Sequence, residues 1–286
     1  MVHYIEAIGA SFKRQAAEYP GSLCERWIYT HQPQNSLKPH QSIKNIIAVA
    51  SGKGGVGKST VAFNLAHTLA CNNLSVALLD ADIYGPSLPI LCGITEKALL
   101  RTDKHFEPHY AFNMSMLSIG HLVDPQTALI WRGPMACGAL MQLFSQTAWP
   151  ALDIMVIDLP PGTGDLILTL CQKIPLVGVL MVAVDHPLAL ADVKRSAAMF
   201  EKLNIPSLGT VMNYHATSSS QATSDSIVNL AYTRNLFDST AYAQPLSLYA
   251  PQAPEVQVFQ SLAEQIVDKI AQKPLFSTIP ISVVGG

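Results

Sequence analysis

The chain has 286 residues, of which 49% are hydrophobic and 13% are charged, and its formal net charge is −2. This length and composition allow a large buried core in one α/β domain with an appendage, while the small net charge and the lack of any run of like charges do not favour binding to nucleic acid. No apolar run approaches a membrane span, the first residues lack the pattern of a signal peptide, and five scattered cysteines suit a reducing compartment, so we expect a cytoplasmic protein that binds no membrane.

The distribution of prolines and polar residues divides the chain into three regions. Residues 1–43 combine a short possible helix with several prolines and a polar run, which is typical of an N-terminal appendage with a linker. Residues 44–274 carry the regular apolar patterns and form the predicted main domain. Residues 275–286 form a tail without the basic charge or apolar spacing of a membrane-binding helix.

The strongest motif begins with an apolar, β-branched run at 46–50, which is followed by a glycine-rich turn and by helical apolar spacing over 61–70. The turn fits the G-x-x-x-x-G-K-[ST] spacing, in which backbone N–H groups close on a triphosphate. We expect Lys58 to contact the β- and γ-phosphate oxygens and the Ser59 hydroxyl to ligate Mg²⁺. The predicted nucleotide-binding residues are Gly52, Lys53, Gly54, Gly55, Val56, Gly57, Lys58, Ser59 and Thr60.

A flexible glycine loop is the alternative interpretation of this turn. It is less favoured because a strand, the loop, Lys58 and a helix follow one another in the order that places phosphates on a helix N-terminus. The motif therefore predicts ATP or GTP binding.

Two carboxylates follow at the end of a predicted strand over 74–83. Asp80 and Asp82 are two residues apart, a spacing that puts both on one face of a strand at the carboxyl edge of the sheet. Such a pair is often only a turn. One helix beyond a phosphate-binding loop, however, a carboxylate can reach the Mg²⁺ shell or position the attacking water.

The middle of the chain predicts two short strands at 106–108 and 114–120, a helix over 135–146 and a buried strand over 153–158. Asp158 ends that strand and suits an Mg²⁺ ligand acting through a water molecule. Residues 160–164 fit either a glycine-rich switch loop or a rigid proline turn. Trp131 and Arg132 fit either a dimer contact or a helix start.

The remaining pattern predicts a strand at 176–184, a helix at 188–203, a strand at 207–212, a polar loop at 214–226 and a helix at 255–273. Buried strands alternate with helices along most of the chain. The predicted fold is therefore α/β, with a doubly wound, mainly parallel sheet.

The loop Lys53-Gly-Gly-Val-Gly-Lys-Ser-Thr60 resembles the deviant Walker A loop of the MinD, ParA and nitrogenase iron protein group of P-loop NTPases. The motifs at 79–87, 131–135 and 158–165 are similar to those of its Mrp/ApbC branch, ATPases proposed to carry iron–sulfur clusters to apoproteins. The resemblance runs from about residue 43 to Asn213, in the order that the family shows.

The resemblance implies a homodimer that encloses nucleotide and Mg²⁺. In the family the first lysine of the loop reaches the partner's nucleotide, which gives Lys53 a catalytic role beside Lys58 and Asp82; an ordinary solvated lysine is the alternative. Ser59 and Asp158 hold Mg²⁺, and Asn213 matches the asparagine that recognises the base, for which a side-chain amide is chemically suited.

The chain departs from the family after Asn213, where Mrp-type proteins usually carry Cys-x-x-Cys. Here no cysteine follows Cys171, and the polar stretch at 214–226 offers one histidine and several hydroxyls, which are poor ligands for iron–sulfur clusters. Cys137 could supply one ligand per subunit or could simply pack in the core. The cluster ligands are left unassigned, and a heteromeric subunit that has the cysteines is an alternative source.

The sequence thus predicts an Mg²⁺-dependent ATPase resembling proteins that bind iron–sulfur clusters and transfer them to apoproteins. The alternative is an ATP-driven dimeric switch or adaptor of the MinD/ParA type that has lost cluster binding. A role in DNA segregation ranks third, because the charge balance offers no basic surface.

Overall fold

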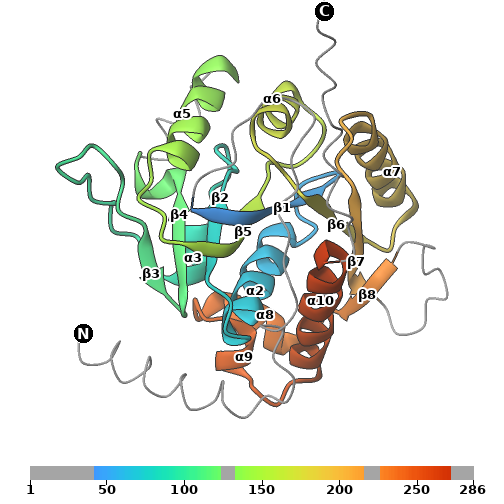
Figure 1. Ribbon diagram of the computed structural model, residues 1–286. Helices are drawn as coiled ribbons and strands as arrows, with labels where there is room; N and C mark the ends of the chain where they lie inside the picture. The colour runs from blue at the N-terminus through green and yellow to red at the C-terminus, as the bar shows by residue number, and fades with distance from the viewer. Residues whose placement is uncertain (1–41, 124–132, 216–225, 272–286) are drawn as a thin grey trace, which may run out of the picture.

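The computed structural model describes residues 42–123, 133–215 and 226–271. Within these ranges an eight-stranded sheet runs through the centre of the molecule in the order β3-β4-β2-β5-β1-β6-β7-β8, with helices on both faces (Figure 1). All neighbouring strands are parallel except β3 and β4, which form a hairpin. The predicted doubly wound, mainly parallel sheet is therefore confirmed. The strands are β1 (Ile43–Ser51), β2 (Val76–Asp80), β3 (His109–Ala111), β4 (Met114–Ser118), β5 (Leu152–Asp158), β6 (Gly178–Val184), β7 (Ser207–His215) and β8 (Ser226–Ala231).

Two hydrophobic clusters lie on the two faces of the sheet, because the central strands are apolar on both sides. In β1, Ile47 and Val49 belong to one cluster, while Ile46 and Ala48 belong to the other. Helices α2 (Lys58–Cys71), α3 (Leu88–Cys92), α8 (Arg234–Ala241), α9 (Leu246–Tyr249) and α10 (Pro254–Ala271) lie over the first face. Helices α5 (Gly133–Ser145), α6 (Asp165–Lys173) and α7 (Pro187–Lys202) cover the second, and a short 3₁₀ turn, η3 (Ile119–His121), follows β4.

The strand register brings the site residues to one edge of the sheet. Asp80 of β2 is the register partner of Asp158 of β5, and Asp158 is the partner of Val49 near the end of β1. The loop that leaves β1 therefore lies beside both carboxylates, at the carboxyl edge where open α/β sheets bind ligands.

Several element boundaries differ from the predicted ones. The first strand of the hairpin is His109–Ala111, while Phe106 forms isolated bridges with Leu100 and Thr147. Strand β2 ends at Asp80, so Asp82 lies in the following turn and does not share a strand face with Asp80. Strand β7 continues through Asn213, where the chain still pairs with β6.

The region between β7 and α10 contains elements that the sequence pattern does not predict. Strand β8 pairs with β7, and helix α8 begins with a Thr233 side-chain cap. The predicted appendage up to residue 41, Trp131, Arg132 and the tail from residue 272 lie outside the described residues. None of the described helices is long and apolar enough to span a membrane.

Two buried histidines are held in their neutral forms. The His121 Nδ1 accepts the Ser118 N–H at 3.2 Å and its Nε2 lies 3.0 Å from the Ile94 carbonyl, which fixes the tautomer with hydrogen on Nε2. The His67 Nδ1 lies 3.1 Å from the Phe112 carbonyl. Burial lowers the pKa of both imidazoles from 6.5 to about 4.

The free energy of unfolding is therefore expected to fall as the pH decreases from 6.5 towards 4. In that window the unfolded chain binds protons that the folded chain excludes, which costs about 1–3 kcal/mol per histidine. Urea unfolding at pH 7 and at pH 5 measures this change. His121→Gln should show a shallower dependence on pH than the wild type, and equal slopes would contradict the assignment.

Candidate nucleotide-binding site

The loop between β1 and α2 has the backbone geometry of a phosphate cradle. Gly55 and Gly57 have φ angles of 77° and 82°, in the left-handed region that favours glycine. Gly57 is the N-cap of α2, and no side chain caps the helix, whose first turn carries no acidic residue. The amides at the start of α2 are thus directed at the loop without a competing side-chain acceptor, an arrangement that suits an anion.

Gly52 allows the loop to pack against helix α7. A Cβ atom at this position would lie 2.4 Å from the Asp192 Cβ and 2.6 Å from the Asp192 carbonyl carbon. Because the second neighbour is backbone, any larger residue would push the loop away from α7. The first glycine of the motif thus fixes the position of the loop.

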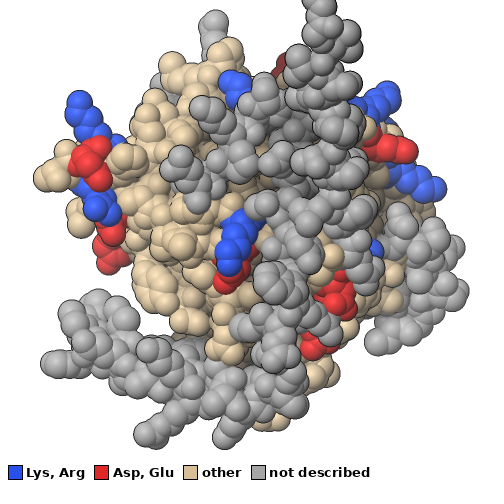
Figure 2. Space-filling view, viewed as in Figure 1, with Lys and Arg blue, Asp and Glu red and all other residues tan. Residues whose placement is uncertain are grey.

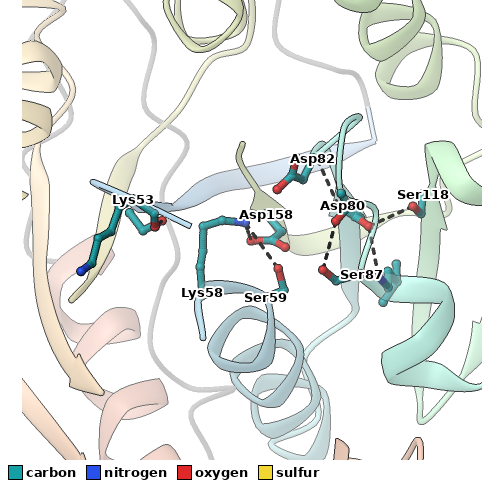
Figure 3. A network of polar contacts seen from close by, with 11 residues as sticks. Lys53, Lys58, Ser59, Asp80, Asp82, Ser87, Ser118 and Asp158 are labelled. Atoms are coloured by element: carbon teal, nitrogen blue, oxygen red, sulfur yellow. Dashed lines mark hydrogen bonds and ion pairs between the residues drawn. The ribbon is translucent and has the colours of Figure 1, made fainter. Parts of the chain in front are cut away.

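Three predicted residues converge beneath the loop. The Lys58 Nζ lies 2.5 Å from an Asp158 carboxylate oxygen and 3.4 Å from the Ser59 hydroxyl (Figure 3). The Lys58 and Asp158 side chains are 7% and 4% exposed, so this ion pair is shielded from water. The Ser59 hydroxyl and the Asp158 carboxylate lie around the same Lys58 ammonium group. Both are oxygen ligands of the kind that Mg²⁺ takes in phosphate-binding sites.

Asp80 holds the turn that carries Asp82. Its carboxylate accepts hydrogen bonds from the Leu88 N–H at 3.1 Å, the Ser118 hydroxyl at 2.9 Å and the Asp82 N–H at 3.0 Å. Burial, together with the nearby Asp158 charge, raises the pKa of Asp80 to about 7. Ser87, the N-cap of α3, makes no side-chain cap, so Asp80 supplies an acceptor to this helix start. The sequence analysis did not predict that Asp80 anchors the turn that carries Asp82. The usable signal was an acidic residue shortly before Pro86-Ser-Leu-Pro89, where the next helix begins.

Asp82 faces the site from this anchored turn. Its side chain is half-buried, and Figure 3 shows it on the same side as Asp158 and Lys58. Burial raises the pKa of Asp82, while the Lys58 charge opposes that shift. The structure therefore brings Asp82, Asp158, Lys58 and Ser59 together, as predicted.

Lys53 does not join this group. Its side chain is exposed, and Figure 3 shows it directed away from Lys58 and Asp158. The turn is held by the Ser51 hydroxyl, which donates to the Lys53 carbonyl at 2.9 Å. Lys53 thus has no part in the phosphate cradle of its own chain in this structure.

The loop after β5 is tied to the phosphate cradle. The Gly162 N–H donates to the Ser51 carbonyl at 2.9 Å, and Gly162 has a φ angle of 92°. A Cβ at Gly54 would lie 4.0 Å from the Pro161 ring. The loop after β5 therefore lies directly against the phosphate cradle.

Asn213 lies beneath the other side of the cradle. Its side-chain amide donates to the Val56 carbonyl at 2.7 Å, while its Oδ1 is buried and accepts no hydrogen bond from the described residues. A Cβ at Gly57 would lie 2.2 Å from the Asn213 Nδ2, so only glycine fits there. One N–H of the Asn213 amide thus serves the loop, while its Oδ1 is a buried acceptor without a hydrogen bond from the described residues.

The cysteines do not form a cluster site within the described residues. Cys137 lies on α5 and is 7% exposed, which agrees with simple packing. Burial raises the pKa of Cys71 and Cys92 to about 11 and that of Cys171 to about 12, which keeps these thiols protonated. No group of three or more His, Cys, Asp or Glu side chains in the described part of the chain could hold a metal ion.

Comparisons with known proteins agree with this geometry. The family described as ParA, NUBPL iron-transfer P-loop NTPase, matches residues 42–243, more than half of the chain. An iron-sulfur cluster carrier protein of Pseudomonas fragi is 50% identical over 188 residues, which cover 65% of this chain and 66% of that protein. The iron-sulfur cluster carrier protein of Escherichia coli K12 is 50% identical over 172 residues, and the iron-sulfur cluster transfer protein NUBPL of Dictyostelium discoideum is 48% identical over 184.

The match to the Escherichia coli protein covers 60% of this chain and 47% of that protein. The match to the Dictyostelium protein covers 64% of this chain and 57% of that protein. The chain therefore spans about half to two thirds of the length of these relatives. Among solved structures, the nucleotide-binding protein of Archaeoglobus fulgidus in complex with ADP has a TM-score of 0.60 and 27% identity, covering 79% of this chain and 92% of that one. The cell division ATPase MinD of Pyrococcus furiosus shares the fold with a TM-score of 0.64 at 20% identity, covering 79% of this chain and 99% of that one.

Proposed function

The chain belongs to the ParA family of NUBPL-type iron-transfer P-loop NTPases, and on this premise we propose that it is an Mg²⁺-dependent ATPase acting in the transfer of iron–sulfur clusters to apoproteins. The observation that carries the proposal is the convergence of Lys58, Ser59 and Asp158 beneath the β1–α2 loop. The relatives described as cluster carriers and as a cluster transfer protein support the second half of the proposal.

The residues of the cradle have separate tasks in this proposal. The loop amides and the N-terminus of α2 bind the phosphates. The Lys58 ammonium group leaves its ion pair with Asp158 and binds phosphate oxygens instead. Ser59 and Asp158 would hold Mg²⁺, which would supply positive charge to the phosphates. Asp82, on the turn anchored by Asp80, orients the attacking water.

A second copy of the chain completes the site. Lys53 is exposed and directed away from its own cradle, so its charge is available to a nucleotide bound by a partner subunit. A positive charge placed where the transferring phosphoryl group gathers negative charge lowers the barrier, as an arginine finger does. We therefore assign the active form to a homodimer, with Lys53 acting in trans.

The cargo is handled differently from the nucleotide. Thiolate sulfur is the normal ligand of an iron–sulfur cluster, and Cys92, Cys137 and Cys171 are buried. Residues 214–226 contain one histidine and several hydroxyls in place of the usual Cys-x-x-Cys. The ligands that residues 42–123, 133–215 and 226–271 offer do not fit a cluster bridged between two copies of this chain, so the thiolates are expected to come from a partner protein.

The same residues favour a second candidate function, an ATP-driven dimeric switch that acts on a protein partner and carries no iron–sulfur cluster.

A DNA-binding role gains no support from the charges. On the face shown in Figure 2, the described Lys and Arg side chains are scattered and lie near Asp or Glu rather than forming a basic patch.

Anaerobic reconstitution with iron and sulfide tests the proposal. The homodimer alone is expected to lose most of its iron on desalting, whereas a complex with a thiolate-bearing cluster protein should keep it and release it to an apoprotein faster when ATP is present. Release that is unaffected by ATP favours the switch. Stoichiometric iron retained by the homodimer and lost in Cys137→Ala would contradict the assignment of the thiolates to a partner.

A further inference from the structure

Two tyrosines stand beside the cradle, at the side opposite to Asp82. Tyr214 directly follows Asn213 in β7, and its hydroxyl lies 3.2 Å from the position of a Cβ on Gly57, the N-cap of α2. Tyr232 follows the end of β8, the strand next to β7. The two rings pack edge to face, with their centroids 5.4 Å apart and an angle of 72° between the planes.

Neither ring is used by the hydrophobic core. Tyr214 is 41% exposed and Tyr232 is 65% exposed, so the pair presents aromatic surface to solvent at the mouth of the site. Tyr214 also adopts a φ angle of 55°, which is unfavourable for a bulky residue. Such strain is kept mainly where the side chain must take a particular position.

A second observation points to a ligand at the same place. The Val56 carbonyl accepts from the Asn213 Nδ2, which fixes the orientation of the amide and leaves Oδ1 as a buried acceptor without a hydrogen bond from the described residues. An unsatisfied buried acceptor is costly, and a donor on a ligand removes that cost. The exocyclic amino group of adenine is such a donor.

We propose that Tyr214 and Tyr232 form an aromatic platform on which the purine base of the nucleotide stacks, next to the buried Oδ1 of Asn213. The inference rests on the proposed ATP binding and adds the residues that bind the base. The phosphates occupy the N-terminus of α2, and the ribose extends from there past Gly57 to the two rings. Base stacking on aromatic side chains needs the ring face and not the hydroxyl.

Calorimetry with ATP and with inorganic tripolyphosphate tests this platform. Tyr232→Ala and Tyr214→Ala are each expected to weaken ATP binding about 5- to 100-fold and to leave tripolyphosphate binding unchanged. The corresponding Phe variants should bind ATP as the wild type does. Tyr242→Ala is the matched control, because Tyr242 is 66% exposed and stacks on Tyr249 away from the cradle.

The outcomes separate the platform from the proposed function. Wild-type protein that binds neither ATP nor tripolyphosphate refutes the phosphate cradle itself. Wild-type protein that binds both equally well, or Ala variants that bind ATP as tightly as or more tightly than the wild type, refute the platform and keep the cradle. Ala variants that lose both ligands together show that the rings only support the loop.

Discussion

Asp82→Ala is expected to bind ATP with near wild-type affinity and to hydrolyse it at least about 10²-fold more slowly. The carboxylate lies on the turn after β2, beside Asp158 and Lys58, and is not part of the loop that holds the phosphates. Its removal therefore affects the positioning of water in the transition state more than the binding of the triphosphate. Phosphate release and equilibrium ATP binding, measured on the same preparation, separate the two effects.

Lys58→Ala is expected to show the opposite pattern. Loss of a charged hydrogen-bond donor to the phosphates should weaken ATP binding about 10- to 100-fold. Because Lys58 neutralises the buried Asp158, thermal unfolding must first show that the variant is folded. Asp153→Ala serves as the matched control, since Asp153 lies on the same strand as Asp158 but pairs with Lys44 outside the site.

Equal turnover by the wild type and Asp82→Ala would remove Asp82 from its role.

The core of the site could be predicted from sequence because its chemistry is local. The P-loop spacing, the strand before it and the helix after it are contiguous, so Lys58 and Ser59 follow from one motif. Asp158 was predicted from its place at the end of a buried, β-branched strand. The parallel register then brings it next to Asp80 and the loop, as the sheet rules require.

The parts that could not be predicted depend on contacts between distant segments. Asp80 has its anchoring role because Ser118 and Leu88 meet it in space, and neither contact leaves a local pattern. Strand β8 is a short run of six residues next to a polar stretch, and it becomes a strand because β7 offers an edge to pair with. The position of Cys137 near a helix start permitted exposure or burial, and only the packing of α5 on the rest of the molecule decided for burial.

Lys53→Ala is expected to bind ATP and to lose at least about 10²-fold in hydrolysis, because an arginine-finger-like charge contributes only in the transition state. The loop amides, Lys58 and Ser59 remain in place, so the affinity for the triphosphate should change little. Lys44→Ala, which removes a lysine from the far end of β1, should hydrolyse ATP as the wild type does. Wild-type turnover by Lys53→Ala would make Lys53 an ordinary surface lysine.

The assembly of the site across a homodimer is tested most directly by ATP hydrolysis in an equal mixture of Lys53→Ala and Asp82→Ala proteins. Each mixed dimer has one site with an intact Asp82 facing an intact Lys53 from the other subunit, and one site that lacks both. Random pairing makes half of the dimers mixed, so the mixture should recover about a quarter of the wild-type rate. A mixture that stays as inactive as either parent, although mixed dimers are shown to form, would contradict action of Lys53 across the interface.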